Sequence, residues 1–276
     1  MYLKVVFFVA ICAGALAIPA QDDMSIFFEH TQPDARIVGG TTAGPVPWMV
    51  ALTNGLLVRQ FICGASVVTN RHLLTAAHCI SAVFSVGSLS SSLRATVGTN
   101  RWNTGGTHYN LERNITHPNY VASVIKNDLG FLVTRTNIVF NNVVEPAVLN
   151  YDFANAGVRT RVNGWGRTRA GGSLSAVLLE LEATIVDGNF CASEVQRLAQ
   201  QLNVRGVPPV EPHIEICTFH SLNHGTCNGD SGSALVRAGT NQQVGVVSWG
   251  LPCARGAPDM FVRVSAFRAW IESVIR

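Results

Sequence analysis

The sequence predicts an all-β protein, and a few observations lead to this prediction. Short runs rich in Val, Ile, Leu and Thr recur along the chain and are separated by Gly, Asn and Pro. They do not alternate with helical segments, which favours a β-sandwich or barrel over β–α units. Hydrophobic residues make up 47% of the 276 residues and charged residues 13%, a composition typical of compact cores. We expect one large β unit or two closely joined β halves.

The first segment, residues 1–17, has the pattern of a secretory signal peptide. It reads "MYLKVVFFVAICAGALA", with one lysine, an apolar run and an Ala-Leu-Ala ending. A membrane anchor is the alternative, but it needs about 20 apolar residues. The run from Val5 to Ile18 is shorter and is followed by polar residues up to Arg36. We therefore expect a secreted, extracellular protein that is not held in a membrane.

The expected strands and helices follow in order. The β-type runs are "FICGASVV" (61–68), "HLLTAA" (72–77), "RTRVNGWG" (159–166), "AVLLELEATIV" (176–186), "QVGVVSWG" (243–250) and "MFVRV" (260–264). Two stretches predict helices, "FCASEVQRLAQQLN" (190–203) and the terminal "SAFRAWIESVI" (265–275). The terminal stretch places Phe267, Trp270, Ile271 and Val274 on one face at helical spacing.

Cysteines and charges limit the class of function. Of the seven cysteines, Cys12 leaves with the signal peptide, and six in an exported chain favour three disulfides, which could pair in fifteen ways. From Ile37 onward, 18 Lys+Arg against 13 Asp+Glu give a formal charge of +5, and 17 of the 18 are arginines spaced singly. This spacing indicates an arginine-rich soluble surface and no nucleic-acid partner. No metal-ligand spacing or nucleotide loop is present, so we expect no cofactor and no metal.

The stretch "CNGDSGSALV" (227–236) holds the candidate nucleophile. Ser231 is either reactive or part of an ordinary Gly/Ser/Asp turn. A reactive serine needs a base, a carboxylate that orients the base, and donors for an oxyanion. His78 lies in the β-like run "LLTAAHC", which ends in a cysteine, and Asp128 enters the apolar stretch "KNDLGFLV", where an acid is costly to bury unless it has a partner.

These motifs occur together in the order of a known family. The set is "RIVGG", "TAAHC", "NDLGFL", "NGWG", "CNGDSG" and "SWG", and with these motifs the chain resembles the trypsin/chymotrypsin-like serine proteases, family S1, from Ile37 to Arg276. The resemblance implies two six-stranded antiparallel β-barrels with the active site in the cleft between them and a C-terminal α-helix. It makes residues 37–276 the serine protease domain and the chain a serine endopeptidase.

The resemblance also implies roles for single residues. His78 would be the general base and acid, Asp128 would orient its ring, and Ser231 would attack the peptide carbonyl. The backbone N–H groups of Gly229 and Ser231 would form the oxyanion hole, where only glycine reaches the required backbone conformations cheaply. The implied disulfides are Cys63–Cys79, Cys191–Cys217 and Cys227–Cys253.

The stretch "RIVGG" implies a zymogen. Cleavage after Arg36, by a trypsin-like protease or by the enzyme itself, would free the amino group of Ile37. That ammonium would pair with Asp230, since a buried carboxylate needs a counter-charge. Residues 18–36 would be the activation peptide. A plain strand start is the alternative interpretation of this stretch.

The specificity pocket is assigned by the same resemblance. Gly225, six residues before the nucleophile, would form its floor, and Ser248 and Gly250 its wall and mouth. Counting back from the strand at 261–264 puts Asp259 on the opposite wall, as in the crustacean and insect serine collagenases. We expect cleavage after basic and large apolar residues alike. If Asp259 points to solvent instead, the pocket is chymotrypsin-like.

Three features depart from the family pattern, and two other functions compete. Ser233-Ala234 stands where Gly-Pro is usual, Gly130 stands where alanine is common, and the segment 191–217 is longer than usual.

A non-catalytic homologue acting as a binding or regulatory protein usually lacks one of the three catalytic residues. A regulatory cascade protease usually carries cysteine-rich modules and demands arginine.

We therefore expect a digestive or tissue-degrading monomer whose partners are protein or peptide substrates and protein inhibitors of proteases. Asn114-Ile115-Thr116 is a sequon for glycosylation.

Overall fold

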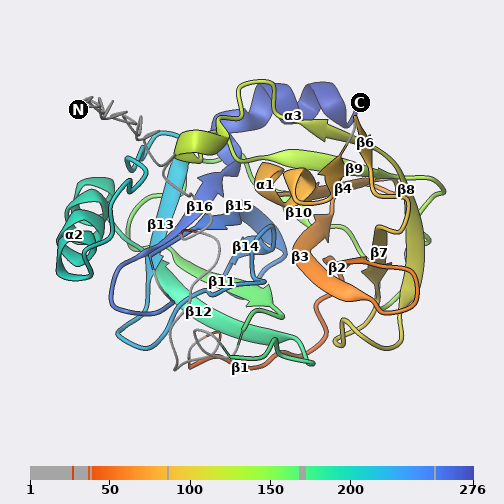
Figure 1. Cartoon of the computed structure of the whole chain (residues 1–276), viewed down its shortest axis with the longest axis horizontal. Helices are drawn as coiled ribbons and strands as arrows, with labels where there is room; N and C mark the ends of the chain where they lie inside the picture. The colour runs from red at the N-terminus through yellow and green to blue at the C-terminus, as the bar shows by residue number, and fades with distance from the viewer. Residues whose placement is uncertain (1–26, 28–36, 38, 86, 168–171, 252) are drawn as a thin grey trace, which may run out of the picture.

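The structure is a computed structural model of the whole chain. It describes residues 27, 37, 39–85, 87–167, 172–251 and 253–276 (Figure 1). The expected signal peptide, residues 1–17, and the expected cleavage residue Arg36 lie outside these described residues.

The first half of the chain forms a closed antiparallel barrel. Its strands follow one another in the order β2-β3-β4-β9-β8-β7. Their bounds are β2 Met49–Asn54, β3 Gln60–Val67, β4 His72–Thr75, β7 Arg94–Val97, β8 Thr107–Thr116 and β9 Gly130–Thr134. A small hairpin of β5 (Phe84–Ser85) and β6 (Ser88–Leu89) lies beside it. Figure 1 shows this barrel in orange to green on the right.

The second half forms the other barrel. Strands β12, β11, β14, β15, β16 and β13 pair in that order, and β12 pairs with β13 to close the ring. Their bounds are β11 Arg159–Gly164, β12 Leu179–Ile185, β13 Glu215–Phe219, β14 Ala234–Arg237, β15 Gln242–Trp249 and β16 Asp259–Arg263. The short β1 (Thr41–Thr42) and β10 (Val148–Leu149) add to its edges. Two six-stranded antiparallel barrels are therefore confirmed.

Alternating side chains explain the barrel cores. Along β12, every second residue from Leu179 to Ile185 is buried while Glu180 and Glu182 are not, as expected of a strand with one face inward. The central strands β4 and β9 are buried almost throughout. They pair with each other in register from His72–Val133 to Thr75–Gly130. The segment that holds His78 follows the end of β4, and Asp128 lies two residues before the start of β9.

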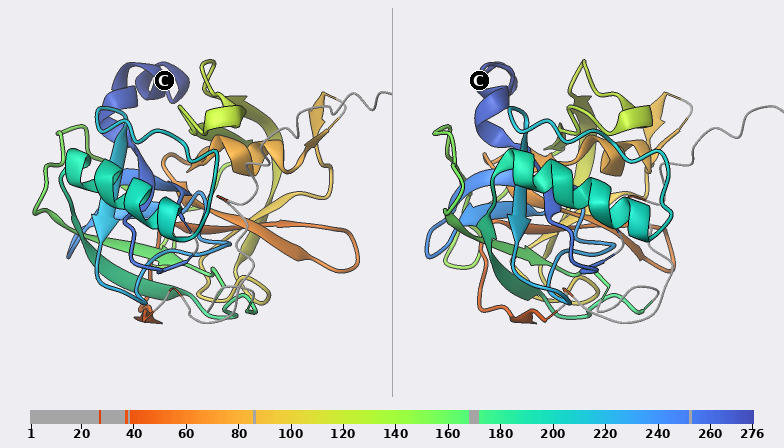
Figure 2. Two further views of the ribbon diagram at one scale, coloured as in Figure 1. Left: turned by 60° about the vertical axis from the view of Figure 1, so that its left-hand side comes forward. Right: turned by 90° about the vertical axis from the view of Figure 1, so that its left-hand side faces the viewer.

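Two predicted helices are present, and one predicted strand is shorter than expected. Helix α2 (Gly188–Gln201) covers the outside of the second barrel, and Asp187 caps its first turn (Figure 2). Helix α3 (Arg268–Val274) follows the 3-10 turn η3 (Val264–Phe267) and packs on the first barrel. The run "HLLTAA" is a strand only to Thr75, because the chain turns into the short helix α1 (Ala77–Ser81). No helix in the described ranges is long and apolar enough to cross a bilayer.

Candidate active site

His78 lies on α1 and not at the end of a strand, which corrects the sequence interpretation. Its backbone N–H donates to Oδ1 of Asp128 at 2.8 Å, and its Nδ1 lies 2.8 Å from Oδ2 of the same carboxylate. The hydroxyl of Ser248 donates to Oδ2 as well, at 2.6 Å. The carboxylate therefore holds both the ring and the backbone of His78, which leaves Nε2 as the ring nitrogen that does not face it.

Asp128 is buried, with 1% of its surface exposed. Burial raises the pKa of a carboxyl, but here the charge of His78 and the hydrogen bonds from His78 and Ser248 outweigh burial and lower the pKa of Asp128. The group is therefore a carboxylate at neutral pH. A buried anion in contact with an imidazole stabilises the ring in its charged form and fixes its orientation.

Ser231 comes from the second barrel, and its loop packs against the first. Its carbonyl accepts a hydrogen bond from Gly64 N on β3 at 2.9 Å. The next residue, Gly232, lies so close to the segment before α1 that a Cβ would come within 2.2 Å of Thr75 Oγ1 and 3.3 Å of Ala76 N. These contacts bring the loop of Ser231 against the two residues that lead into the helix of His78.

The loop 227–231 leaves backbone donors beside Ser231. Gly229 has a φ of 93°, a conformation that glycine adopts at little cost. Within the described part of the chain, the N–H groups of Gly229 and Ser231 have no protein acceptor. Two such donors next to a serine hydroxyl are the chemistry that an oxyanion requires.

Asp230 points away from the cleft into the second barrel. It is fully buried, and its two oxygens accept from Gly166 N and Cys227 N at 2.9 Å each. Burial outweighs these bonds and raises the pKa of Asp230 to about 7. Ile37 is also fully buried and packs with apolar residues of the same barrel, among them Val162. Within the described residues, the uncleaved chain therefore gives the ionised form of Asp230 two backbone hydrogen-bond donors and no counter-charge.

Asp259 lies between the two glycines that the sequence assigns to the pocket. A Cβ on Gly225 would approach Asp259 Oδ2 to 2.9 Å, and one on Gly250 would lie 3.7 Å from Oδ1. Oδ2 accepts from Thr226 N at 2.7 Å. The residue is 9% exposed, and burial raises its pKa to about 7 despite this hydrogen bond. The carboxyl group therefore lies beside both glycines, where it can gain or lose its charge near neutral pH.

A pocket beside Ser231 reaches Gly250, whereas Gly225 and Asp259 lie next to it and not in its lining. Its lining consists of Phe27, Thr226, Cys227, Asn228, Ser231, Val247, Ser248, Trp249, Gly250 and Leu251. Phe27, from the expected activation peptide, is 2% exposed, and its ring meets that of Trp249 edge-on at 6.0 Å. Its carbonyl accepts from Gly250 N at 3.4 Å. Peptide backbone and an aromatic side chain therefore fit beside Trp249. A larger groove of about 460 Å³, on the first barrel, contains none of these residues.

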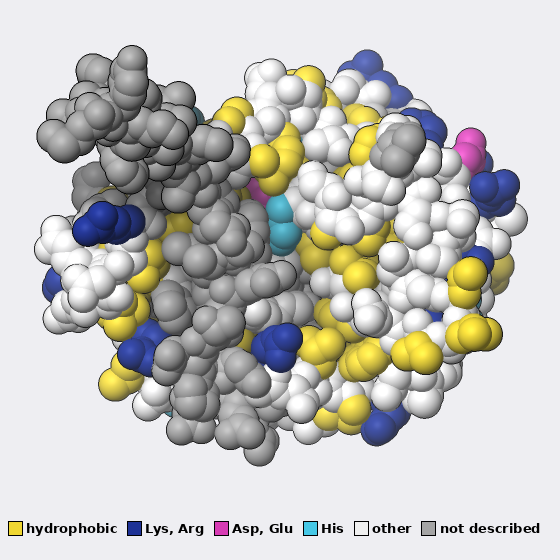
Figure 3. Space-filling model, viewed as in Figure 1, with side chains coloured by type: hydrophobic (Ala, Val, Ile, Leu, Met, Phe, Trp, Pro, Cys, Tyr) yellow, Lys and Arg dark blue, Asp and Glu magenta, His cyan; other side chains and the backbone are white. Residues whose placement is uncertain are grey.

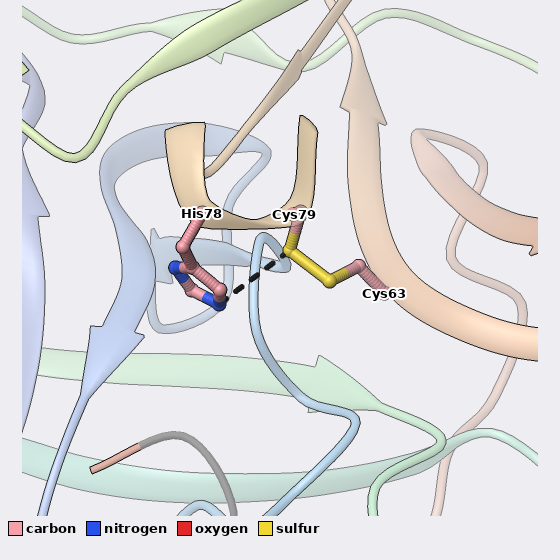
Figure 4. Close-up of side chains that lie close together, drawn as sticks. All are labelled: Cys63, His78 and Cys79. Atoms are coloured by element: carbon pink, nitrogen blue, oxygen red, sulfur yellow. Dashed lines mark hydrogen bonds between the residues drawn. A yellow bond between two sulfur atoms is a disulfide. The ribbon is translucent and has the colours of Figure 1, made fainter. Parts of the chain in front are cut away.

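The disulfides of the structure are Cys63–Cys79, Cys191–Cys217 and Cys227–Cys253, the pairs that the resemblance implied. The first lies next to His78, whose Nε2 is 3.6 Å from Cys79 Sγ (Figure 4). His78, Cys63 and Cys79 lie close enough together to suggest a metal site. Metal binding by cysteine requires thiolates, however, and both sulfurs are joined in the disulfide, so this group does not bind a metal. The bond instead ties α1 to β3 and steadies the position of His78.

Two departures from the family pattern have a packing explanation. At Gly130 a Cβ would lie 2.4 Å from the end of Ile80, so the missing methyl makes room for that side chain. Ser233 is fully buried, and its hydroxyl fills the space above Gly64, where a Cβ would come within 2.1 Å. Neither change touches His78.

A buried ion pair at the cleft was missed by sequence reasoning. Lys126 Nζ lies 2.8 Å from Glu215 Oε1, and both side chains are buried. The same Oε1 accepts from Trp249 Nε1 at 2.9 Å. One signal was present, because Lys126 is the only lysine from Ile37 onward and stands two residues before Asp128. Its partner is 89 residues away, and nothing in the sequence connects the two.

The face of the molecule in Figure 3 shows a histidine near its middle, with hydrophobic side chains gathered beside it. With two barrels, a carboxylate-bound histidine and a serine on the facing loop, fold and site define a class of hydrolases that use a serine. Comparison with known proteins agrees, since the family model described as Trypsin matches residues 37–271. The chain belongs to the trypsin family.

Similar proteins come from insects. The chain is 31% identical to "Trypsin alpha-4" of Lucilia cuprina over 97% of both chains. It is 33% identical to "Chymotrypsin-2" of Vespa crabro, over 86% of this chain and 98% of that one. It is 31% identical to "Trypsin delta" of Drosophila erecta, over 87% and 88%. The chain is therefore a serine endopeptidase, and the relatives include both trypsins and a chymotrypsin.

Proposed function

We propose that the chain is a secreted endopeptidase that cleaves proteins through an acyl-enzyme. His78 takes the proton of Ser231 and later donates it to the leaving amine, and Asp128 holds the ring in the tautomer that this requires. The N–H groups of Gly229 and Ser231 stabilise the oxyanion, a contribution worth about 10²–10³ in rate for each donor. The observation that carries the proposal is the pair of hydrogen bonds from His78 to the buried carboxylate of Asp128.

The enzyme is made as a zymogen. Residues 1–17 are the signal peptide, residues 18–36 the activation peptide and residues 37–276 the protease domain. Cleavage after Arg36, by another trypsin-like protease or by the enzyme itself, frees the ammonium of Ile37, which pairs with Asp230. Support comes from the burial of Asp230 with a raised pKa, because an ionised form there requires a counter-charge.

The specificity is broad, of the chymotrypsin and collagenase kind. A substrate side chain enters past Ser248 and Gly250 toward Gly225, and the two glycines leave room for large apolar side chains. The carboxyl of Asp259, between these glycines, attracts arginine and lysine when it is charged. A glycine floor with an acid on the wall thus accepts both substrate classes.

The biological role that fits best is digestion or tissue degradation outside the cell, by a monomer that protein protease inhibitors control. The three disulfides support an extracellular protein, since such bonds persist in oxidising surroundings. Asn114 is a candidate glycosylation site. Its amide donates to Thr116 Oγ1 at 3.3 Å and it is partly exposed.

A cleavage profile tests the proposal. The chain is cleaved after Arg36, incubated with a peptide library, and the new termini are sequenced. We expect cuts after Arg, Lys, Leu and Phe, and none with Ser231→Ala prepared in the same way. Cuts after aromatic residues and leucine alone would reject the role of Asp259. Equal cutting by Ser231→Ala would reject the mechanism.

A further inference from the structure

A network of three buried side chains spans the two barrels behind the cleft. Lys126 precedes Asp128 in the first barrel, whereas Glu215 on β13 and Trp249 on β15 belong to the second. Glu215 is 4% exposed, Lys126 5% and Trp249 3%. None of these side chains has a role in the mechanism above, yet a buried ion pair of this kind is costly to maintain.

Glu215 is fully engaged. Oε1 accepts from Lys126 Nζ and from the indole N–H of Trp249, and Oε2 accepts from Glu211 N at 2.7 Å. The ammonium of Lys126 lies 5.4 Å from the centre of the Trp249 ring, close enough for a cation–π contact. The indole is therefore held through its N–H by the carboxylate and through its ring by the ammonium.

The held indole also contacts the residue Phe27. The ring of Phe27 packs edge-on against Trp249, and the carbonyl of Phe27 is hydrogen-bonded to the next residue, Gly250. Ile125, beside Lys126, belongs to the same apolar cluster as Phe27 and Trp249. A peptide with an apolar side chain thus already lies at this place in the structure, against a wall whose orientation depends on Glu215.

We propose that Glu215, neutralised by Lys126, is a positioning residue that fixes the indole of Trp249 as the wall of a subsite for an apolar side chain of the bound peptide. The pair thereby sets selectivity upstream of the scissile bond. The inference rests on the proposed endopeptidase function. Lys126 provides the charge that lets a carboxylate stay buried, and the carboxylate provides the acceptor that orients the indole.

Two double variants separate these roles. Removing one partner alone would leave a buried charge unpaired and destabilise the fold, so both charges are removed together. K126M/E215Q keeps an oxygen that can accept from the Trp249 N–H, whereas K126M/E215M does not. The exposed pair on α2 provides a matched control, E194Q/R197M, which removes an ion pair far less buried than this one.

The assay uses the enzyme cleaved after Arg36 and two kinds of substrate. One is a single-residue ester, which has no upstream residue to occupy the proposed subsite. The others are tetrapeptide amides with Phe or Ala at the second, third or fourth residue before the scissile bond. We expect wild type, K126M/E215Q and E194Q/R197M to prefer Phe over Ala at one of these positions. K126M/E215M should lose at least fivefold of this preference in kcat/KM and stay within twofold of wild type on the ester.

Equal preference in the two double variants would overturn the proposal. So would an equal loss on ester and peptides by K126M/E215M, which would indicate a merely structural pair. A failure of the proposed function is distinguishable from both outcomes, because wild type would then hydrolyse neither the ester nor any peptide.

Discussion

The balance between arginine and leucine cleavage should change with pH, because Asp259 changes its charge near neutrality. Burial raises the pKa of this carboxyl to about 7. At pH 6 about a tenth of the enzyme then carries the charged form, and at pH 8 about nine-tenths. An arginine side chain gains from that charge, whereas a leucine side chain does not. The ratio of kcat/KM for arginine over leucine should therefore rise about tenfold from pH 6 to pH 8.

The ratio isolates Asp259 from the rest of the site. kcat/KM reports groups of the free enzyme, so the pKa of Asp259 without bound substrate applies. The catalytic residues are shared by both substrates, so their effects cancel in the ratio. The assay compares two peptide amides that differ only in the residue before the scissile bond.

Asp259→Asn is the matched variant, since its amide oxygen can still accept from Thr226 N. We expect a ratio that no longer depends on pH. Activity after arginine should fall about 10- to 150-fold at pH 8, the equivalent of about 1.5–3 kcal/mol for a charged hydrogen bond. A flat ratio in the wild-type enzyme, or an unchanged pH dependence in the variant, would refute the reasoning.

Three further results follow from the structure. Gly229→Ala should lower kcat about 10²–10³-fold, because the new Cβ would lie 2.7 Å from Leu174 at a φ of 93° and would displace the N–H group proposed for the oxyanion hole. A kcat within twofold of wild type would contradict this. Replacing both Cys63 and Cys79 by alanine should lower the free energy of unfolding by about 3 kcal/mol, because the disulfide closes a loop with a sequence separation of 16. Urea unfolding measures this difference, and an unchanged unfolding curve would count against it. In the uncleaved folded chain, Asp230 keeps its proton up to about pH 7, whereas in the unfolded chain it releases the proton near pH 4. The folded chain therefore loses stability as the pH rises from about 4 to about 7. Asp230→Asn should flatten that slope, by up to about 4 kcal/mol in total, and an identical slope would argue against the raised pKa.

Much of the fold could be predicted because strands and turns leave local patterns. The runs around Ser66, Val162 and Val246 lie in strands as expected, since β-branched residues between turn residues carry that signal locally. His78 is different. The apolar run before it continues past Thr75, and only contacts with Asp128 and Cys63 show that the chain has already turned into a helix.

The site was less predictable wherever it depends on distant pairs. The orientation of Asp259 follows from the register of β16 against β13, which no local pattern fixes. Glu215 and Lys126 meet across 89 residues, and nothing in the sequence connects the two. Motifs thus predicted His78 and Asp128, which the structure brings into contact, whereas the pairing of Lys126 with Glu215 became visible only in three dimensions.

Active-site labelling tests the central claim most directly. The chain is treated with an organophosphate before and after cleavage behind Arg36, and the labelled peptide is identified by mass spectrometry. The account predicts one label, on Ser231, which forms in the cleaved chain and only weakly in the uncleaved one. A cleaved chain that takes up no label, or takes it up at another residue, would contradict the account.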